Sequence, residues 1–278
     1  MTAVESANRP LQAPSLEEDY ALLKLAARDA GELALTYFKQ QILVNRKPDG
    51  SEVSEADIAV DTALKLDLRT KRPDYGWLSE ETEDDSERLK YRRVWMVDPI
   101  DGTNAFLRHV PEWTVSAALV EDGVPVLGVV FNPATGEYFH AMRGKGAFLN
   151  DRRLRVAARK RLADSVIACG LPHLGRGDLA LGLRELGAVQ DKVAGLRRFG
   201  SAALDLAFVA AGRIDGYWER NLSAWDMAAG IVMVREAGGF VTDIDGSGDG
   251  MFTKRHIVAG NEVIQRDLQT LLKTAGQT

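Results

Sequence analysis

Val94-Trp95-Met96-Val97-Asp98-Pro99-Ile100-Asp101-Gly102-Thr103-Asn104 is the stretch of sequence from which the fold and its chemistry can be worked out. Its apolar beginning is typical of a buried strand, which here carries two aspartates three positions apart. Pro99 fixes its own φ and biases Asp98 toward an extended conformation. We therefore expect the backbone to turn after Asp98, so that the carboxylates of Asp98 and Asp101 converge on one point.

The end of this stretch suits the binding of an anion. Gly102 permits a close approach of the backbone, and Thr103 with Asn104 can begin a helix whose N–H groups face a negative charge. Two carboxylates held close together repel each other, and burying them unpaired is costly. A divalent cation resolves this conflict, and all-oxygen ligands suit Mg²⁺ or Mn²⁺. Taken alone, the same residues also fit a tight turn with an aspartate cap.

Two further acidic segments extend the pattern. Trp77-Leu78-Ser79-Glu80-Glu81-Thr82 ends an apolar patch with two adjacent acids, of which a strand would direct only one toward Asp98, and we select Glu80. The alternative is a solvated acidic loop that continues to residue 85. Ala224-Trp225-Asp226-Met227 places Asp226 at the start of an alanine-rich helix, where the helix dipole alone would also favour an aspartate.

The periodicity of the remaining chain predicts a mixture of helices and strands. Helices are predicted at 17–40, 54–69, from 178, at 201–211 and at 224–237, and strands at 95–98, 113–120, 125–131, 137–142, near 166, at 214–218, and near 240 and 257. Such an order indicates stacked layers of the α/β or α+β class. We expect a disordered arm at 1–15, a half at 16–155 with the main metal-binding motifs, and a half at 156–278 that contributes Asp226 and substrate contacts.

Composition bounds the possible functions. The 278 residues are 45% hydrophobic and 27% charged, which is ordinary for a soluble globular protein, and the net charge of −5 argues against binding a nucleic-acid polymer. The single cysteine, Cys169, lies in an apolar run and excludes an intrachain disulfide. With neither a signal peptide nor an apolar run of membrane-spanning length in view, we expect a cytoplasmic protein with no membrane partner.

Together the acidic segments resemble the inositol monophosphatase family of magnesium-dependent, lithium-sensitive sugar phosphatases. The matching elements are the Glu80-Glu81 step, Asp98-Pro99-Ile100-Asp101-Gly102-Thr103, and Trp225-Asp226, and the similarity extends over roughly residues 17–270. Further matches lie at 144–148, at 200–203 and at Glu219. The resemblance implies a layered αβαβα sandwich, a homodimer, and hydrolysis of a small phosphorylated polyol.

The resemblance also implies roles for individual residues. Two or three Mg²⁺ ions, replaceable by Mn²⁺, would be held by Glu80, Asp98, the carbonyl of Ile100, Asp101 and Asp226. A metal-activated water would attack phosphorus, oriented by Glu80 and by Thr103 with the help of Asp57. Substrate contacts would come from the following residues: Asp101, Asp226, the backbone of Gly102 and Thr103, Ala202, Glu219 and the loop residue Lys47.

Two departures from the family pattern leave the substrate open. Ser79 stands where glycine is common, and Asn104-Ala105 stands where the inositol enzymes continue Thr-Asn. Inositol monophosphate is the leading substrate. A 3'(2'),5'-bisphosphate nucleotide or a sugar bisphosphate such as fructose 1,6-bisphosphate is the alternative, and a non-catalytic metal-binding protein is a remote one.

Overall fold

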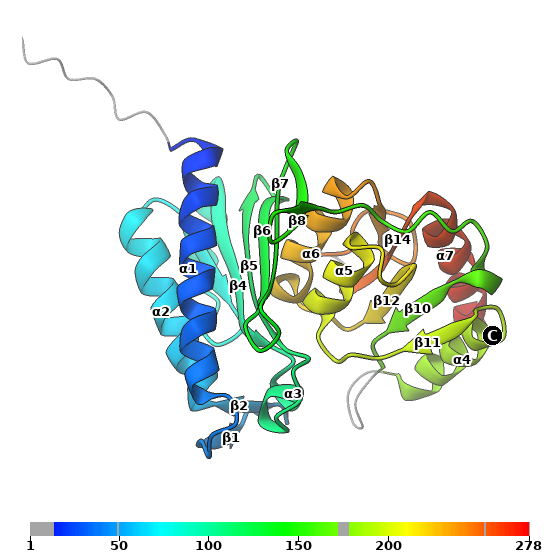
Figure 1. Ribbon diagram of the computed structural model, residues 1–278, viewed down its shortest axis with the longest axis horizontal. Coiled ribbons are helices and arrows are strands. Elements are labelled where there is room, and N and C mark those ends of the chain that lie inside the picture. The colour runs from blue at the N-terminus through cyan, green and yellow to red at the C-terminus, as the bar shows by residue number, and fades with distance from the viewer. Residues whose placement is uncertain (1–13, 49, 172–177, 253, 278) are drawn as a thin grey trace, which may run out of the picture.

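Helices and sheets alternate in five layers across the molecule (Figure 1). The computed structural model describes residues 14–48, 50–171, 178–252 and 254–277. Helices α1 and α2 form the first layer, a seven-stranded sheet the second, and α5 with α6 the third. A five-stranded sheet forms the fourth layer and α4 with α7 the last. The predicted αβαβα sandwich of the α/β class is thus confirmed.

The seven-stranded sheet has its strands in the order β3-β4-β5-β6-β7-β8-β9. Every neighbouring pair is antiparallel except β3 with β4, which is parallel. The series of antiparallel strands predicted from residue 95 onward is therefore correct. The strands are β3 (Gly76–Ser79), β4 (Arg93–Asp101), β5 (Thr114–Glu121), β6 (Val124–Asn132), β7 (Glu137–Met142), β8 (Gly146–Leu149) and β9 (Arg152–Arg153).

Two capped helices cover one face of this sheet. Helix α1 (Leu16–Tyr37) begins at Ser15, whose side chain and that of Glu18 form a reciprocal capping box. Helix α2 (Glu55–Lys71) begins at Ser54 with the same device, Asp57 taking the third helical position. Of the arm predicted at 1–15, residues 1–13 lie outside the described part of the chain, and Ser15 belongs to the cap of α1.

The five-stranded sheet has the order β11-β10-β12-β14-β13, with β10 parallel to both of its neighbours. Helices α5 (Ala202–Ala210) and α6 (Ala224–Glu236) lie between this sheet and the first one (Figure 1). On the outer face lie α4 (Leu179–Gln190) and α7 (Glu262–Gln277). The strands are β10 (Val166–Cys169), β11 (Gly195–Arg197), β12 (Gly216–Arg220), β13 (Phe240–Thr242) and β14 (His256–Gly260).

Short elements complete the chain. They are the hairpin β1 (Val44–Arg46) with β2 (Glu52–Ser54), the helix α3 (Thr103–Leu107), and the 3₁₀ helices η1 (Ser86–Lys90) and η2 (Leu162–Asp164). Helix α7 has no counterpart in the prediction, although its buried residues Ile264, Leu268 and Leu272 recur every four positions. No helix in the described ranges has the length and apolar character needed to cross a membrane.

Three apolar cores follow the layers. The first lies between α1, α2 and the seven-stranded sheet, the second surrounds α5 and α6, and the third lies beneath α7 and contains Cys169. The chain passes from one sheet to the other between Arg153 and Val166. The division near residue 155 stays a prediction about domains, because α5 and α6 contact strands of both sheets.

Candidate active site

A bulge in β4 brings Asp98 and Asp101 to the same side of the sheet. Asp98 lies opposite Ser116 of β5 and Asp101 opposite Thr114, so three steps along β4 match two along β5. Residues three apart in a regular strand face opposite sides, and one extra residue in a bulge reverses that relation. The expected turn after Asp98 is therefore wrong. The strand continues to Asp101, and the bulge makes the carboxylates converge.

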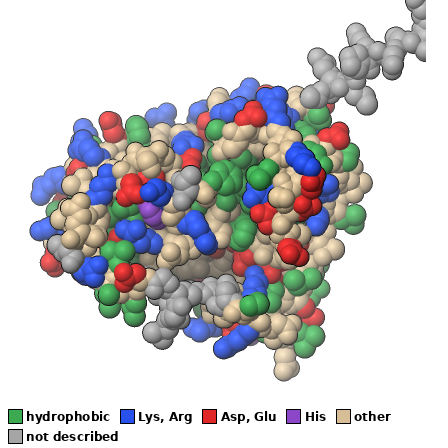
Figure 2. Space-filling model, turned by 180° about the vertical axis from the view of Figure 1, so that it is seen from behind, with side chains coloured by type: hydrophobic (Ala, Val, Ile, Leu, Met, Phe, Trp, Pro, Cys, Tyr) green, Lys and Arg blue, Asp and Glu red, His purple; other side chains and the backbone are tan. Residues whose placement is uncertain are grey.

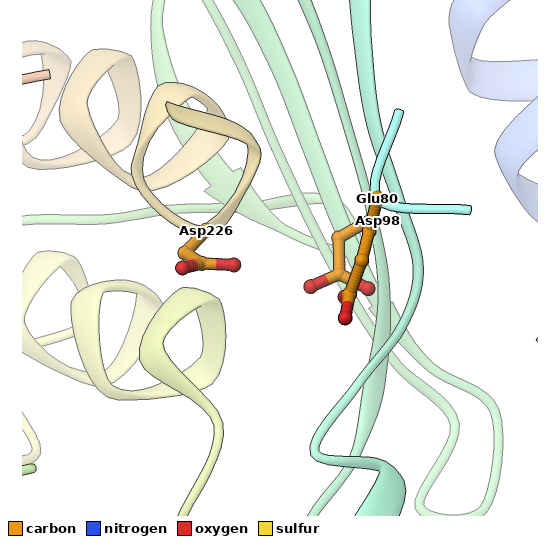
Figure 3. Close-up of side chains that lie close together, drawn as sticks. All are labelled: Glu80, Asp98 and Asp226. Atoms are coloured by element: carbon orange, nitrogen blue, oxygen red, sulfur yellow. The ribbon is translucent and has the colours of Figure 1, made fainter. Parts of the chain in front are cut away.

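Three carboxylates meet beside this bulge. One oxygen each from Glu80, Asp98 and Asp226 lies within 4.8 Å of the other two. Glu80 follows the end of β3, Asp98 lies in β4, and Asp226 reaches the cluster from the first turn of α6 across the gap (Figure 3). We call these three residues the carboxylate cluster. Its members come from the three acidic segments that the sequence analysis singled out, at 77–82, 94–104 and 224–227.

Asp101 lies beside the carboxylate cluster and is hydrogen-bonded to α5. Its Oδ2 accepts the hydroxyl of Ser201 at 2.6 Å and the N–H of Ala203 at 2.7 Å. This arrangement joins the end of β4 to the N-terminus of α5, where backbone N–H groups favour an anion. All three predicted aspartates therefore share one site, with Asp101 held by protein donors on one oxygen.

Burial and mutual repulsion make the site poorly suited to carboxylates alone. Burial, followed by the charges of Glu80, Asp101 and Asp226, raises the pKa of Asp98 well above its ordinary value. Burial, followed by the charges of Asp101 and Glu80, likewise raises the pKa of Asp226 well above its ordinary value. Burial raises the pKa of Asp101 to about 6, against the opposing hydrogen bonds from Ser201 and Ala203. A divalent cation would relieve this repulsion, so the donor set fits a metal that prefers oxygen ligands.

Thr103 connects the bulge to α2. Its hydroxyl lies 3.4 Å from Oδ1 of Asp57 and donates to the carbonyl of Ile100 at 3.1 Å. Asp57 accepts the N–H of Ser54 at 2.8 Å through its other oxygen, and burial raises its pKa to about 6. The pairing of Thr103 with Asp57, which the resemblance implied, is present in the structure.

Lys47 reaches the cluster from the loop between β1 and β2. Its Nζ donates to Glu80 at 2.9 Å and to Glu81 at 2.6 Å. The argument that a strand would turn one acid away is wrong, because β3 ends at Ser79 and both acids follow it. Glu80 is nevertheless the one that joins the carboxylate cluster, while burial raises the pKa of Glu81 to about 7.

A cavity of about 510 Å³ opens above the cluster. Its walls include Glu80, Asp98, Ile100, Asp101 and Asp226 from the predicted metal site, and Gly102, Thr103, Ala202 and Glu219 from the predicted substrate contacts. Asn104 and Ala105, which differ from the family pattern, also line the cavity. The back of the molecule in Figure 2 shows a hollow near its middle with acidic and basic side chains around it.

Several other residues of the cavity wall were not predicted, some of them charged. Arg108, Glu112 and Arg198 also line the walls. Arg108 follows α3 and Arg198 follows β11. Both arginines lie in loops, where apolar periodicity does not predict which way a side chain points. The only sequence signal is that Arg198 lies close to the family match at Gly200-Ser201.

Gly102 illustrates how tightly the cavity floor is built. Its φ of +94° lies in the left-handed region that favours glycine, and a Cβ at this position would lie 2.8 Å from the carbonyl oxygen of Glu112. Both constraints allow only glycine at the start of α3. The backbone of Gly102 and Thr103 can therefore approach a bound group more closely than a side chain would permit.

Glu219 enters the cavity from β12 on the opposite wall. Its Oε2 accepts a short hydrogen bond from the hydroxyl of Tyr217, two residues earlier on the same strand. Burial raises the pKa of Glu219 to about 7, with the Tyr217 hydrogen bond opposing the rise. Behind it, Asp205 is buried with no hydrogen-bond partner for Oδ1 in the described structure, and burial with the charge of Glu219 raises its pKa.

Known proteins resemble this chain in sequence and in fold. A model of the inositol monophosphatase family matches residues 15–277. The chain is 51% identical to the inositol-1-monophosphatase of Mesorhizobium japonicum over 89% of this chain and 90% of the relative, and 38% identical to the Nus factor SuhB of Escherichia coli over 85% and 88%. The crystal structure of the extragenic suppressor protein suhB from Bartonella henselae has a TM-score of 0.85 and 47% identity, covering 91% of this chain and 97% of that one.

A five-layer fold with crowded carboxylates in a polar cavity is suited to cation-dependent hydrolysis of a phosphorylated molecule. The sequence and structural comparisons make the assignment specific. The chain belongs to the inositol monophosphatase family, which is a family of metal-dependent phosphomonoesterases. The predicted resemblance and the predicted class of enzyme are thereby confirmed.

Proposed function

We propose that this protein is a Mg²⁺-dependent phosphatase that hydrolyses inositol monophosphate to inositol and phosphate. The observation that carries the proposal is the carboxylate cluster, in which oxygens of Glu80, Asp98 and Asp226 lie within 4.8 Å of one another. Support for the substrate comes from the relative of 51% identity that is named inositol-1-monophosphatase. Mn²⁺ is the expected substitute, because it accepts the same oxygen ligands.

The proposed metal ligands are Glu80, Asp98, Asp226, Asp101 and the carbonyl of Ile100. When bound, the cation supplies Lewis-acid charge that polarises the phosphoryl group and lowers the pKa of water. Oδ1 of Asp98 accepts the N–H of Ile100 at 3.1 Å, so Asp98 and the carbonyl-bearing residue Ile100 are joined directly. This contact orients the carboxylate of Asp98. The two or three ion positions in this proposal come from the family resemblance.

The protein's own groups orient water and phosphate in this proposal. In this proposal the hydroxyl of Thr103, 3.4 Å from Oδ1 of Asp57, turns its proton from the Ile100 carbonyl to Asp57 and accepts a hydrogen bond from a water. Thr103 and Glu80 then align the attacking water. The backbone N–H groups of Gly102 and Thr103 receive phosphate oxygens at the start of α3. Ala202, at the start of α5, and the carboxyl of Glu219 contact the polyol.

Lys47 completes the proposed site. Because its ammonium contacts both Glu80 and Glu81, it balances part of the negative charge while no cation is bound. Its place in the loop between β1 and β2 allows it to change partners when substrate phosphate enters. We also propose the homodimer that the family resemblance implies, and light scattering of the purified protein measures it directly.

Turnover of a substrate panel tests the proposal. Phosphate release with Mg²⁺ is measured on inositol 1-phosphate, adenosine 3',5'-bisphosphate and fructose 1,6-bisphosphate, and the highest kcat/KM is expected for inositol 1-phosphate. A higher value for either bisphosphate moves the assignment to a nucleotidase or a sugar bisphosphatase. No release from any member favours a protein that binds metal without catalysis.

Two variants connect turnover to the cluster. Asp98→Asn and Asp226→Asn are each expected to lower kcat by at least about three orders of magnitude, because each removes a charge that neutralises the cation. Asp245→Asn is a matched control, because Asp245 lies in the surface turn after β13, where it is paired with Lys254. Full activity in both cluster variants would contradict the assignment.

A further inference from the structure

A glycine at the end of β10 faces the carboxyl of Glu219. Strand β10 pairs with β12 in parallel, with Cys169 opposite Trp218, and the N–H of Gly170 donates to the carbonyl of Trp218 at 3.1 Å. This register sets Gly170 beside Glu219, and both line the cavity. The two residues therefore meet where the ends of neighbouring strands form one wall.

The space that a side chain would need at Gly170 is filled by the Glu219 carboxyl group. A Cβ built on Gly170 would lie 1.8 Å from Cδ of Glu219, 2.0 Å from Oε2 and 2.1 Å from Oε1. Apart from Gly170 and its two chain neighbours, these are the three heavy atoms nearest to that position. The glycine thus leaves room for one specific group, which is the group expected to contact the polyol.

The backbone itself does not require glycine at this position. Gly170 is absent from the described glycines with positive φ, so an alanine can adopt its backbone conformation without strain. Glu219 is held from the other side by the hydroxyl of Tyr217. One wall of the cavity therefore fixes the carboxyl between a hydrogen-bond donor and an α-carbon without a side chain.

We propose that Gly170 is a specificity-determining residue, which directs the carboxyl of Glu219 into the cavity and thereby selects substrates with a hydroxyl group at that wall. The inference rests on the proposed function, because it takes Glu219 as a contact of the polyol. Gly170 acts through Glu219 and is a positioning residue. Tyr217 is the second part of the same arrangement.

The test compares a polyol phosphate with a monoester that has no ring hydroxyl groups. For Gly170→Ala, the ratio of kcat/KM on inositol 1-phosphate to kcat/KM on p-nitrophenyl phosphate is expected to fall about tenfold, mainly through KM. The size follows from loss of one hydrogen bond to a charged group. Gly195→Ala, in β11 of the same sheet, is the matched control, because its Cβ would meet nothing closer than 3.7 Å.

A double-variant cycle separates positioning from simple obstruction. If Gly170 acts through Glu219, then Gly170→Ala in a Glu219→Ala background leaves the ratio at the value of Glu219→Ala alone. Tyr217→Phe, which removes the donor and adds no atoms, is expected to lower the ratio in the same direction. A full additional tenfold loss in the double variant overturns the proposal, as does an unchanged ratio in Gly170→Ala.

Failure of the proposed function gives a different result. A wild-type protein that hydrolyses p-nitrophenyl phosphate but prefers a bisphosphate to inositol 1-phosphate refutes inositol monophosphate as the substrate. The Gly170 inference is then measured on the preferred substrate by the same ratio. A wild-type protein with no Mg²⁺-dependent turnover on any of these esters refutes both. Thermal melts of each variant show that loss of selectivity occurs in folded protein.

Discussion

Replacing Asp98 by asparagine is expected to stabilise the metal-free protein while destroying its activity. Asp98 is 1% exposed, and its carboxylate lies within 4.8 Å of oxygens from Glu80 and Asp226. Two unit charges at that distance repel by about 3.5 kcal/mol at an effective dielectric constant of 20. Asparagine removes this repulsion and keeps Oδ1, which accepts the N–H of Ile100.

The net gain is smaller than the full repulsion. Protonation of Asp98 already relieves part of it, because the pKa of this carboxyl is raised, and Lys47 screens Glu80. We therefore expect a gain of about 2 kcal/mol in the free energy of unfolding at pH 8. For a chain of this size that corresponds to a rise of roughly 5 °C in Tm.

The assay is a thermal melt of wild type and Asp98→Asn in EDTA at pH 8, repeated with Mg²⁺. The variant is expected to melt higher in EDTA, and the wild type is expected to gain more from Mg²⁺, since binding to the folded state adds RT ln(1 + [L]/Kd). Asp19→Asn is the control, because the carboxylate of Asp19 is buried but paired with Arg72 and Arg93, so its loss should destabilise. A lower Tm for Asp98→Asn in EDTA would refute the argument from repulsion.

Three further outcomes follow from the site. Burial raises the pKa values of Asp57 and Asp101 to about 6, so the folded metal-free protein binds these protons more tightly than the unfolded chain. The free energy of unfolding of the metal-free protein should therefore fall as the pH rises from about 4 through 6. The Mg²⁺-induced rise in Tm should be larger at pH 8 than at pH 5.5. Equal rises in Tm at the two pH values would argue against a carboxylate site. Ser201→Ala removes the hydroxyl that caps α5 and donates to Asp101. The variant should lose about 1–2 kcal/mol of stability and need more Mg²⁺ for activation. An unchanged Mg²⁺ titration would show that this hydrogen bond does not orient the Asp101 carboxylate. Lys47→Ala leaves Glu81 without its ammonium partner, and burial raises the pKa of Glu81 to about 7. Because Glu81 is charged at pH 8 and mostly neutral at pH 5.5, urea titrations should show a loss in stability of about 1–2 kcal/mol at pH 8 and a smaller loss at pH 5.5. A loss that does not depend on pH would point to packing.

Much of the fold could be predicted from local patterns. The helices α1 and α2 follow apolar periodicity. The helices α5 and α6 and the strands β5 and β6 are buried on nearly every side, and their apolar runs between turn signals made them predictable. Helix α7 was missed although its buried residues recur at helical spacing. The order of strands within the five-stranded sheet depends on contacts between segments far apart in the sequence, which periodicity does not contain.

The site residues could be predicted where they lie in short sequence motifs. Asp98, Asp101 and Asp226 were identified from spacing and from the resemblance, but the bulge that aligns the first two was not, since it depends on pairing with β5. The nearness of Gly170 to Glu219 likewise comes from the register of two strands about fifty residues apart in the chain. A glycine after an apolar run gives no sign in the sequence that it makes room for a distant carboxyl.

The position of α6 has a consequence for synthesis of the chain. The carboxylate cluster requires Glu80 and Asp98 from near the first sheet and Asp226 from a helix formed much later. A ribosome that has made only the first two hundred residues holds a chain whose acidic pair has no third member. A nascent chain shorter than this cannot assemble the cluster, so a cation that needs all three carboxylates can be held only after α6 has been made.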